Sequence, residues 1–305
     1  MVKYRARQRR MIEAEFIAAL RRLPLHPGAL GLADDAARLG GYVLTTDTMV
    51  EGVHFLATDP PEDIAWKLVA TNLSDLAAKG ARPEGALLNY PLGEDKWDRA
   101  FLAGLDTALA ALDCPLIGGD TVSLPEGAAR VLTLTAIGAD AVAPARSGAL
   151  PGDDLWVTGT IGDAGAGLAI ARGAAGPAAL LAAYRRPRPR VAEGRLLAAH
   201  VHAMMDVSDG LLIDAWRMAA ASGCAVAIDL ARVPLSADYR ATGGDALAAA
   251  TAGDDYQLLF AAAPDAPLPV PATCVGTFVE GSGLSLTEGD RAVPLPPRLG
   301  FEHRA

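Results

Sequence analysis

The chain has 305 residues, of which 51% are hydrophobic, so it is long enough for one large domain or two ordinary domains with a full core. Its net charge of -9 argues against binding nucleic acid through a broad basic face. The sequence contains no run of about 18 apolar residues, which argues against a membrane-spanning helix.

The first ten residues and the cysteines give two further expectations. Positive charges are concentrated at the start of the chain, at Lys3, Arg5, Arg7, Arg9 and Arg10. We predict a solvated or poorly ordered terminus rather than a signal peptide, because Glu13 and Glu15 interrupt the apolar region that a signal peptide needs. The three cysteines are far apart and fit neither a zinc site nor a disulfide framework, so we expect a cytoplasmic protein with reduced thiols: Cys114, Cys224 and Cys274.

Hydrophobic periodicity predicts an alternation of helices and strands. We expect helices over 11–22, 61–79 and 95–112, and strands over 42–46, 86–90 and 130–138. A segment rich in proline and glycine, 143–152, predicts a domain boundary, so we divide the chain into 1–143 and 144–305. In the second unit we expect strands over 154–158, 225–230 and 274–278, a helix from about 210, two short helices within 235–251, and irregular chain after the last strand.

Two strands are predicted to end in small or polar residues. Thr45, Thr46 and Asp47 follow the apolar start of the strand 42–46, and Gly118-Gly119-Asp120-Thr121 follows the apolar run 115–117. Strand ends are common places for sites, and glycine lets a backbone approach a phosphate or metal closely. A β-turn would give the same residues at 118–121, so this second signal is weak alone.

Other acids have ordinary explanations when each is taken alone. The adjacent Asp34 and Asp35 suit a surface turn or a helix cap. Asp75, within the predicted helix 61–79, could pair with Lys79 on the helix surface. Either Ser208 or Asp209 could cap the helix that follows Gly210.

Two more segments could bind anions. The cluster Arg185-Arg186-Pro187-Arg188-Pro189-Arg190 is either a solvated surface or an anion site. The segment 159–168 is similar in composition to a phosphate-binding loop, but it matches neither the P-loop nor the dinucleotide fingerprint.

The acids at these junctions share small or hydroxyl neighbours, which predicts one combined site: Asp34, Asp35, Asp47, Asp75, Asp120, Asp206 and Asp209. Clustered carboxylates without a cation would raise one another's pKa values. Mg²⁺ removes this repulsion and commonly bridges substrate phosphates. The sequence therefore predicts several Mg²⁺ ions that hold a polyphosphate, and favours phosphoryl transfer.

Six short motifs occur in order along nearly the whole chain: Gly31-x-Ala33-Asp34-Asp35-Ala36, Thr46-Asp47-Thr48-x-x-Glu51-Gly52-x-His54-Phe55, Asn72-x-Ser74-Asp75-x-Ala77-Ala78, Gly118-Gly119-Asp120-Thr121, Asp206-x-Ser208-Asp209-Gly210 and Gly253-Asp254-Asp255-Tyr256-x-Leu258. Together they resemble the thiamine-monophosphate kinase family. This family belongs to the superfamily of aminoimidazole ribonucleotide synthetase, selenophosphate synthetase and the hydrogenase maturation dehydratase. The resemblance implies an α/β (α+β type) fold of two domains, with mixed sheets flanked by helices.

The resemblance also implies a reaction and its site residues. The expected protein is a homodimer through its N-terminal sheet that transfers a phosphoryl group from ATP to thiamine monophosphate. The implied Mg²⁺ ligands are Asp35, Thr45, Thr46, Asp47, Asp75, Asp120, Asp206 and Asp209, of which Asp47, Asp75, Asp120 and Asp209 would be catalytic. The implied ATP contacts are Gly119, Asp120, Arg146 and Ser208, and the implied substrate contacts are His54, Asp254 and Phe301.

The chain departs from the family pattern at four positions. Ala33 replaces a glycine, and Asp254 replaces a longer glutamate. Phe301 stands where the family often has tryptophan, and Ala103 near an expected tyrosine. These departures affect expected substrate contacts and leave every expected metal carboxylate in place.

Three alternatives remain open from the sequence. A synthetase or dehydratase of the same superfamily is one, although those enzymes need a reactive cysteine near one end of the chain, and here the first is Cys114. A non-enzymatic module that binds Ca²⁺ structurally is the second, without EF-hand spacing to support it. The third concerns His54 alone, which could be a purely structural histidine.

Overall fold

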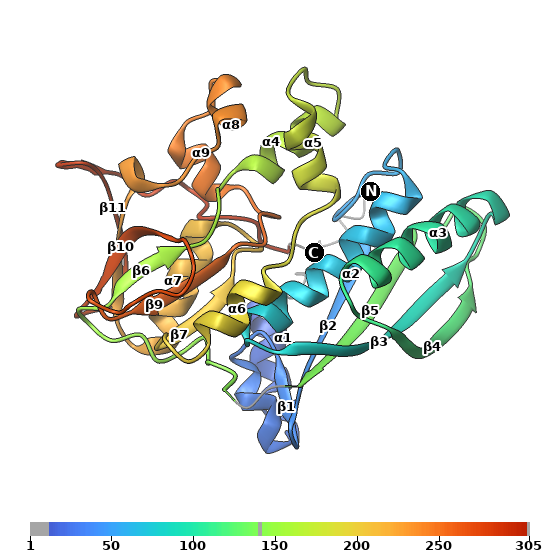
Figure 1. The fold of residues 1–305 in the computed structure, drawn as a ribbon, viewed down its shortest axis with the longest axis horizontal. Coiled ribbons are helices and arrows are strands. Elements are labelled where there is room, and N and C mark those ends of the chain that lie inside the picture. Colours follow the sequence, from blue (N-terminus) through green and yellow to red (C-terminus); the bar gives the residue numbers. More distant parts are fainter. Residues whose placement is uncertain (1–11, 140–141, 304–305) are drawn as a thin grey trace, which may run out of the picture.

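The computed structural model describes residues 12–139 and 142–303, and within them the strands form two mixed sheets (Figure 1). The predicted solvated terminus at residues 1–10 lies outside the described residues. The expected two-domain α/β class, with mixed sheets flanked by helices, is confirmed.

The first sheet has the order β1-β2-β5-β3-β4, in which only the β3–β4 pair is parallel. Its strands are β1 (Ala37–Leu39), β2 (Tyr42–Val50), β3 (Arg82–Leu92), β4 (Leu116–Ser123) and β5 (Val131–Ala139). Its helical segments are α1 (Glu13–Leu20), the 3₁₀ turn η1 (Pro27–Leu32), α2 (Pro61–Ala78) and α3 (Asp95–Ala111). The three predicted helices of this half are confirmed, and Pro61 occupies the first position of α2, where its missing N–H costs nothing.

The second sheet has the order β12-β11-β8-β10-β6-β9-β7, and only β8 and β11 are parallel. Its strands are β6 (Asp154–Val157), β7 (Ala203–Asp206), β8 (Ala225–Asp229), β9 (Leu258–Ala262), β10 (Thr273–Val279), β11 (Gly283–Glu288) and β12 (Arg291–Val293). Its helical segments are α4 (Asp163–Ala171), α5 (Ala178–Arg185), α6 (Val191–Leu197), α7 (Leu211–Ser222), η2 (Leu230–Arg232), α8 (Ala237–Ala241) and α9 (Ala246–Thr251). The two short helices predicted within 235–251 are confirmed.

Two predicted strand ends are wrong. β2 continues through Asp47 to Val50, because all nine of its residues pair with β5, as far as Val131. β4 continues through Gly119 and Asp120 to Ser123, in register with β3. Polar residues that we predicted to lie in loops therefore lie inside strands, because a neighbouring strand forms hydrogen bonds with their backbone N–H and C=O groups.

The expectation of irregular chain after residue 278 is wrong for the segment up to residue 293 and is confirmed for residues 294–303. β11 and β12 follow β10 and extend the second sheet beyond β8. Their short, glycine-flanked sequences carry little strand signal, and the pairing with β8 decides their structure.

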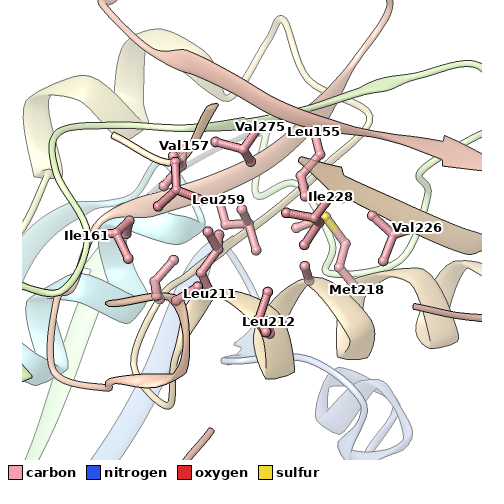
Figure 2. Packing of buried hydrophobic residues seen from close by; sticks show 14 of the residues in the cluster. Leu155, Val157, Ile161, Leu211, Leu212, Met218, Val226, Ile228, Leu259 and Val275 are labelled. Carbon is pink, nitrogen blue, oxygen red and sulfur yellow. The ribbon is translucent and has the colours of Figure 1, made fainter. Parts of the chain in front are cut away.

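Each sheet packs against its own helices through a separate core. In the first half, Leu68 and Leu73 of α2 and Phe101 of α3 are fully buried against Leu132 and Leu134 of β5. In the second half, Leu211, Leu212 and Met218 of α7 pack beneath residues of the sheet that include Leu155, Val226, Ile228 and Val275 (Figure 2). Fully burying one such side chain contributes roughly 2 kcal/mol.

Helix α2 joins the two halves. Its last residues, Ala77 and Ala78, pack with α6, β7 and β9 in a third apolar cluster. α6 approaches so closely that a Cβ on Gly194 would lie 2.0 Å from the Ala77 carbonyl oxygen. This tight contact explains why Gly194 has no side chain and fixes α2 between the two sheets.

Candidate active site

A cavity of about 1100 Å³ lies between the two halves of the molecule. β2, α2, α4 and the loops around 208, 253 and 302 contribute to its lining. The structure brings nine of the predicted site residues to this cavity: Thr46, Asp47, His54, Asp75, Asp206, Ser208, Asp209, Asp254 and Phe301. Five others do not line it: Asp35, Thr45, Gly119, Asp120 and Arg146.

Three carboxylates on the cavity wall have no cationic partner among residues 12–139 and 142–303. Asp47 comes from β2, Asp75 from α2 and Asp206 from the end of β7. Burial, with the negative charges of Asp35 and Asp209, raises the pKa of Asp47 to about 6. Burial and neighbouring acids also raise the pKa values of Asp75 and Asp206 well above the ordinary range. These three side chains, which we call the uncompensated acids, therefore repel one another.

Polar residues of α2 hold the uncompensated acids in place. The Asp47 N–H donates to Asn72 Oδ1 at 3.1 Å, and the Ser74 hydroxyl donates to Asp206 Oδ2 at 2.6 Å. The Thr45 hydroxyl donates to Asp75 Oδ2. One helix thus anchors acids of both sheets, which gives a reason for serine, asparagine and aspartate within an otherwise apolar helix.

A second acid cluster carries its own cations. The Lys79 ammonium forms ion pairs with Asp34 Oδ1 at 2.5 Å and Asp35 Oδ2 at 2.8 Å, and Arg146 Nε donates to Asp35 Oδ1 at 3.0 Å. We call these four residues the paired cluster. Although burial by itself would raise the Asp35 pKa, Lys79 and Arg146 lower it below its ordinary value. The surface pair considered for Asp75 and Lys79 is wrong, because Lys79 is buried and faces the paired cluster.

The loop 206–210 is shaped by a residue that sequence reasoning missed. Asp214 Oδ2 accepts from the backbone N–H groups of Ser208, Asp209 and Gly210 at 3.0–3.2 Å. Neither Ser208 nor Asp209 caps α7 with its side chain, so that prediction is wrong. Arg217 Nη1 contacts both Asp209 and Asp214, so Asp209 has a partial counter-charge that the uncompensated acids lack. Burial raises the pKa of Asp214 to about 7.

The predicted substrate contacts lie around His54. Its Nδ1 accepts from the Val50 N–H at 3.0 Å, so the neutral ring carries its proton on Nε2. Burial, with the nearby His303, lowers the His54 pKa and favours this neutral form. His303 lies 5.3 Å from the His54 ring and 5.0 Å from the Phe301 ring, and all three residues line the cavity.

Lys67 connects the substrate contacts of the two halves. Its ammonium lies 2.7 Å from Asp254 Oδ2, donates to the His54 carbonyl at 3.1 Å, and sits 4.1 Å from the Tyr184 ring centre. Asp254 has a left-handed backbone, with φ of 70°, and its N–H donates to the Ser208 carbonyl at 2.8 Å. The sequence offered one signal for Lys67: with Thr71 and Asp75 it forms a polar stripe at a spacing of four residues on α2.

Gly119 and Asp120 lie away from the cavity. They belong to β4, an edge strand that is exposed along its length. β5 and β3 separate β4 from β2, and the register runs Asp47, Leu134, Leu88, Gly119. Three strand spacings put Gly119 about 14 Å from Asp47 within one chain.

In the two segments that could bind anions, several groups already have protein partners. Asp255 accepts from the Gly162 and Ala164 N–H groups at 2.8 and 3.3 Å, at the start of α4. In the arginine cluster, Arg185 pairs with Asp59 at 3.0 Å, and Arg186 pairs with Asp63 at 2.5 Å. These arginines tie α5 and the chain after it to the start of α2.

The donor set suits Mg²⁺ better than a softer metal. In the described parts of the chain, no three His, Cys, Asp or Glu side chains are arranged as a ready-made metal site. Mg²⁺ does not need one, since it is usually held by one or two carboxylates together with waters and substrate phosphates. The uncompensated acids supply hard oxygen donors and unbalanced negative charge, so they fit this ion. The nearby Thr46 hydroxyl already donates to the Leu134 carbonyl at 3.2 Å and accepts from Thr135 at 3.0 Å.

Comparison with known proteins identifies the family. Residues 33–139 match the AIR synthase related protein N-terminal domain, and residues 151–287 match the corresponding C-terminal domain. The thiamine-monophosphate kinase of Caulobacter vibrioides is 41% identical over 303 residues, covering 91% of this chain and 86% of that protein. The chain belongs to the thiamine-monophosphate kinase family. The Escherichia coli K12 member of this family is 36% identical, covering 90% of this chain and 92% of its own length.

The fold of the family is known from solved structures. The structure of AaThiL complexed with AMPPCP and TMP superposes with a TM-score of 0.86 at 29% identity, covering 98% of this chain and 100% of that chain. The present chain is therefore a thiamine-phosphate kinase by family, an enzyme of the phosphotransferase class. None of its described helices is long and apolar enough to cross a membrane.

Proposed function

We propose that the protein transfers the γ-phosphoryl group of ATP directly to the phosphate of thiamine monophosphate, giving thiamine diphosphate and ADP. The observation that carries this proposal is the pairing, in one cavity, of three uncompensated carboxylates with a neutral histidine and a Lys–Asp pair. The three carboxylates suit a metal-bound polyphosphate. The histidine and the Lys–Asp pair suit a second, smaller substrate. The likeness to AaThiL, complexed with AMPPCP and TMP, supports both halves of this assignment.

Mg²⁺ would be held by Asp47, Asp75 and Asp206, with Thr46 and Asp209 at the edge of the set. When bound, several such ions supply positive charge that neutralises both the carboxylates and the phosphates. Thr45 is a positioning residue in this arrangement, because its hydroxyl is occupied by Asp75. Ser208 remains available to ATP at the cavity wall, whereas Arg146 pairs with Asp35 and does not line the cavity.

The chain's own residues position the acceptor. The acceptor phosphate is ionised at pH 7, so in-line transfer needs alignment more than it needs a strong base. The His54 Nε2–H is a neutral donor that faces the same cavity as Phe301. Lys67 fixes Asp254 relative to the His54 loop, which would hold the acceptor at a constant distance from the uncompensated acids.

A homodimer through the first sheet would give Gly119 and Asp120 a role. β4 exposes Leu116, Ile117 and Val122 along an unpaired edge. Because Asp120 lies too far from Asp47 for both to contact one nucleotide within a single chain, we propose that the Gly119 and Asp120 of a second copy reach the nucleotide.

We also propose the division into domains 1–143 and 144–305, supported by the gap between the two family matches.

The cytoplasm is the proposed compartment, supported by the three buried thiols, which form no disulfide among the described residues.

The test of the proposed reaction is a coupled assay of ADP formation with thiamine, thiamine monophosphate and unrelated phosphomonoesters, each with and without Mg²⁺. We expect ADP only with thiamine monophosphate and Mg²⁺ together. ADP formation that is independent of the acceptor, or equal with all of them, would remove the proposal.

A further inference from the structure

Lys79 occupies a position that is built like a cation site. It follows α2, its side chain is 3% exposed, and it contacts oxygen atoms of four residues that come from three places in the fold. Two are the carboxylates of Asp34 and Asp35, at 2.5 and 2.8 Å. The other two are the backbone carbonyls of Pro144 and Met204, at 3.2 and 3.0 Å. Carboxylate and carbonyl oxygens are also the ligands that hard divalent cations prefer.

The charge of this cluster is already balanced. Asp34 and Asp35 contribute two negative charges, and Lys79 and Arg146 contribute two positive charges. Burial alone would lower the Lys79 pKa, but Asp35 and Asp34 raise it, so the amine is charged at neutral pH. A further divalent ion at Asp35 would meet a fixed ammonium and gain little attraction.

The paired cluster lies beside the proposed metal site. The Thr45 hydroxyl, which donates to Asp75 Oδ2, lies 3.5 Å from the Asp35 carbonyl oxygen, so Asp35 and Asp75 are neighbours. The negative charge of Asp35 also contributes to the raised pKa values of Asp47, Asp75 and Asp206. Those three acids have no Lys, Arg or His partner in the described residues, whereas Asp35 has two. Asp35 therefore has a tethered cation that its three acidic neighbours lack.

We propose that Lys79 substitutes for one divalent cation, as a covalently attached counter-ion on the Asp34–Asp35 side of the nucleotide site. This inference rests on the proposed magnesium-dependent function and refines it. Asp35 then serves as the anchor of Lys79 and Arg146 rather than as a metal ligand. Exchangeable ions gather only at the uncompensated acids. The same ammonium ties α2 to the 144 segment and to β7, so one group both balances the charge and fixes the junction of the two halves.

The test is a count of bound Mn²⁺, used as a spectroscopic substitute for Mg²⁺. Wild type, Lys79→Met and Lys79→Arg are each saturated with AMPPCP, and free Mn²⁺ is measured by electron paramagnetic resonance. We expect Lys79→Met, which empties the cluster of its ammonium, to bind about one more Mn²⁺ per chain than wild type. Lys79→Arg, the matched control that keeps the charge, should bind the same number as wild type. Equal counts for Lys79→Met and wild type would overturn the inference.

A second variant keeps the inference testable if Lys79→Met does not fold. Asp35→Asn, in a chain that retains Lys79, should bind as many Mn²⁺ ions as wild type, because Asp35 is not a metal ligand under this proposal. A loss of about one ion in Asp35→Asn would overturn it. If the proposed function itself is wrong, the result is different from either of these: wild type would bind no Mn²⁺ that depends on the nucleotide.

Discussion

The uncompensated acids and the paired cluster are neighbours with opposite electrostatics. Asp35 has a lowered pKa because Lys79 and Arg146 outweigh the cost of its burial. Asp47, with no such partner, has a pKa raised to about 6 by burial and by the charges of Asp35 and Asp209. The fold thus completes one acid cluster with its own cations and leaves the other incomplete. Such a cluster is stabilised when a positive charge binds beside it, and the proposed metal-bound nucleotide would supply that charge.

The largest expected effect is a loss of catalytic rate when Asp47, one of the uncompensated acids, loses its charge. Asp47→Asn should lower kcat by roughly 10³-fold, because it removes a charge that the proposed metal-bound nucleotide needs. The fold should persist, since the Asp47 N–H keeps its bond to Asn72. Steady-state kinetics and circular dichroism measure the two quantities. Near-normal turnover would count against a metal role for this carboxylate.

The next effect is on stability and concerns the paired cluster. Lys79→Met should lower the free energy of unfolding by about 3 kcal/mol, because it leaves Asp34 and Asp35 buried with only Arg146 as a partner. Urea denaturation of the metal-free protein measures this loss. Arg99→Met, which breaks an exposed pair with Asp95, is the control and should cost far less, because water and salt screen a pair on the surface. Equal losses for the two variants would show that burial does not set the strength of the Lys79 contacts.

The third effect is a dependence of stability on pH. A carboxylate whose pKa is raised on folding stabilises the native state below its unfolded pKa, and this contribution is lost as the pH rises through the folded pKa. For Asp47 the window runs from the ordinary value of 3.8 to about 6, so metal-free protein should lose on the order of 3 kcal/mol across it. Asp75 and Asp206 change in the same direction.

Urea denaturation in EDTA between pH 4 and pH 8 measures this trend. The Asp47→Asn variant is the matched control and should show a shallower fall, since the titrating group is gone. Adding Mg²⁺ and ATP should restore more stability at pH 8 than at pH 5. A wild-type stability that falls no more steeply than that of the variant would contradict the raised pKa of Asp47.

The smallest effect separates the substrate contacts from both acid clusters. His54→Ala should raise the KM for thiamine monophosphate about tenfold through loss of a neutral donor, and leave the KM for ATP nearly unchanged. Lys67→Met should likewise raise the KM for thiamine monophosphate more than the KM for ATP. The reason is that Lys67 contacts Asp254 and the His54 carbonyl rather than the uncompensated acids. Steady-state kinetics with each substrate varied in turn measures the split. An equal rise in both KM values would place these residues at the nucleotide instead.

Local patterns in the sequence predicted most of the helices and a group of acids that we propose as a magnesium site. Apolar periodicity predicted the helix 61–79, and carboxylates beside small or hydroxyl residues pointed to Asp47, Asp75 and Asp206. The fold class was implied by the family resemblance rather than by these patterns. The motif order also carried the resemblance to the family, which the comparisons confirm.

Only the tertiary structure decided which acids are paired. Lys79 lies four residues after Asp75 in the sequence, yet its ammonium contacts Asp34 and Asp35, which come from a distant loop. Asp214 shapes the 208–210 loop through three backbone bonds that no local pattern announces. Pairing with β3 and β5 likewise converts predicted strand ends into strand interiors and carries Asp120 away from Asp47. The reason is physical: a charge is balanced by whatever lies within a few ångströms in space, and spacing along the chain fixes that distance only inside a single helix or strand.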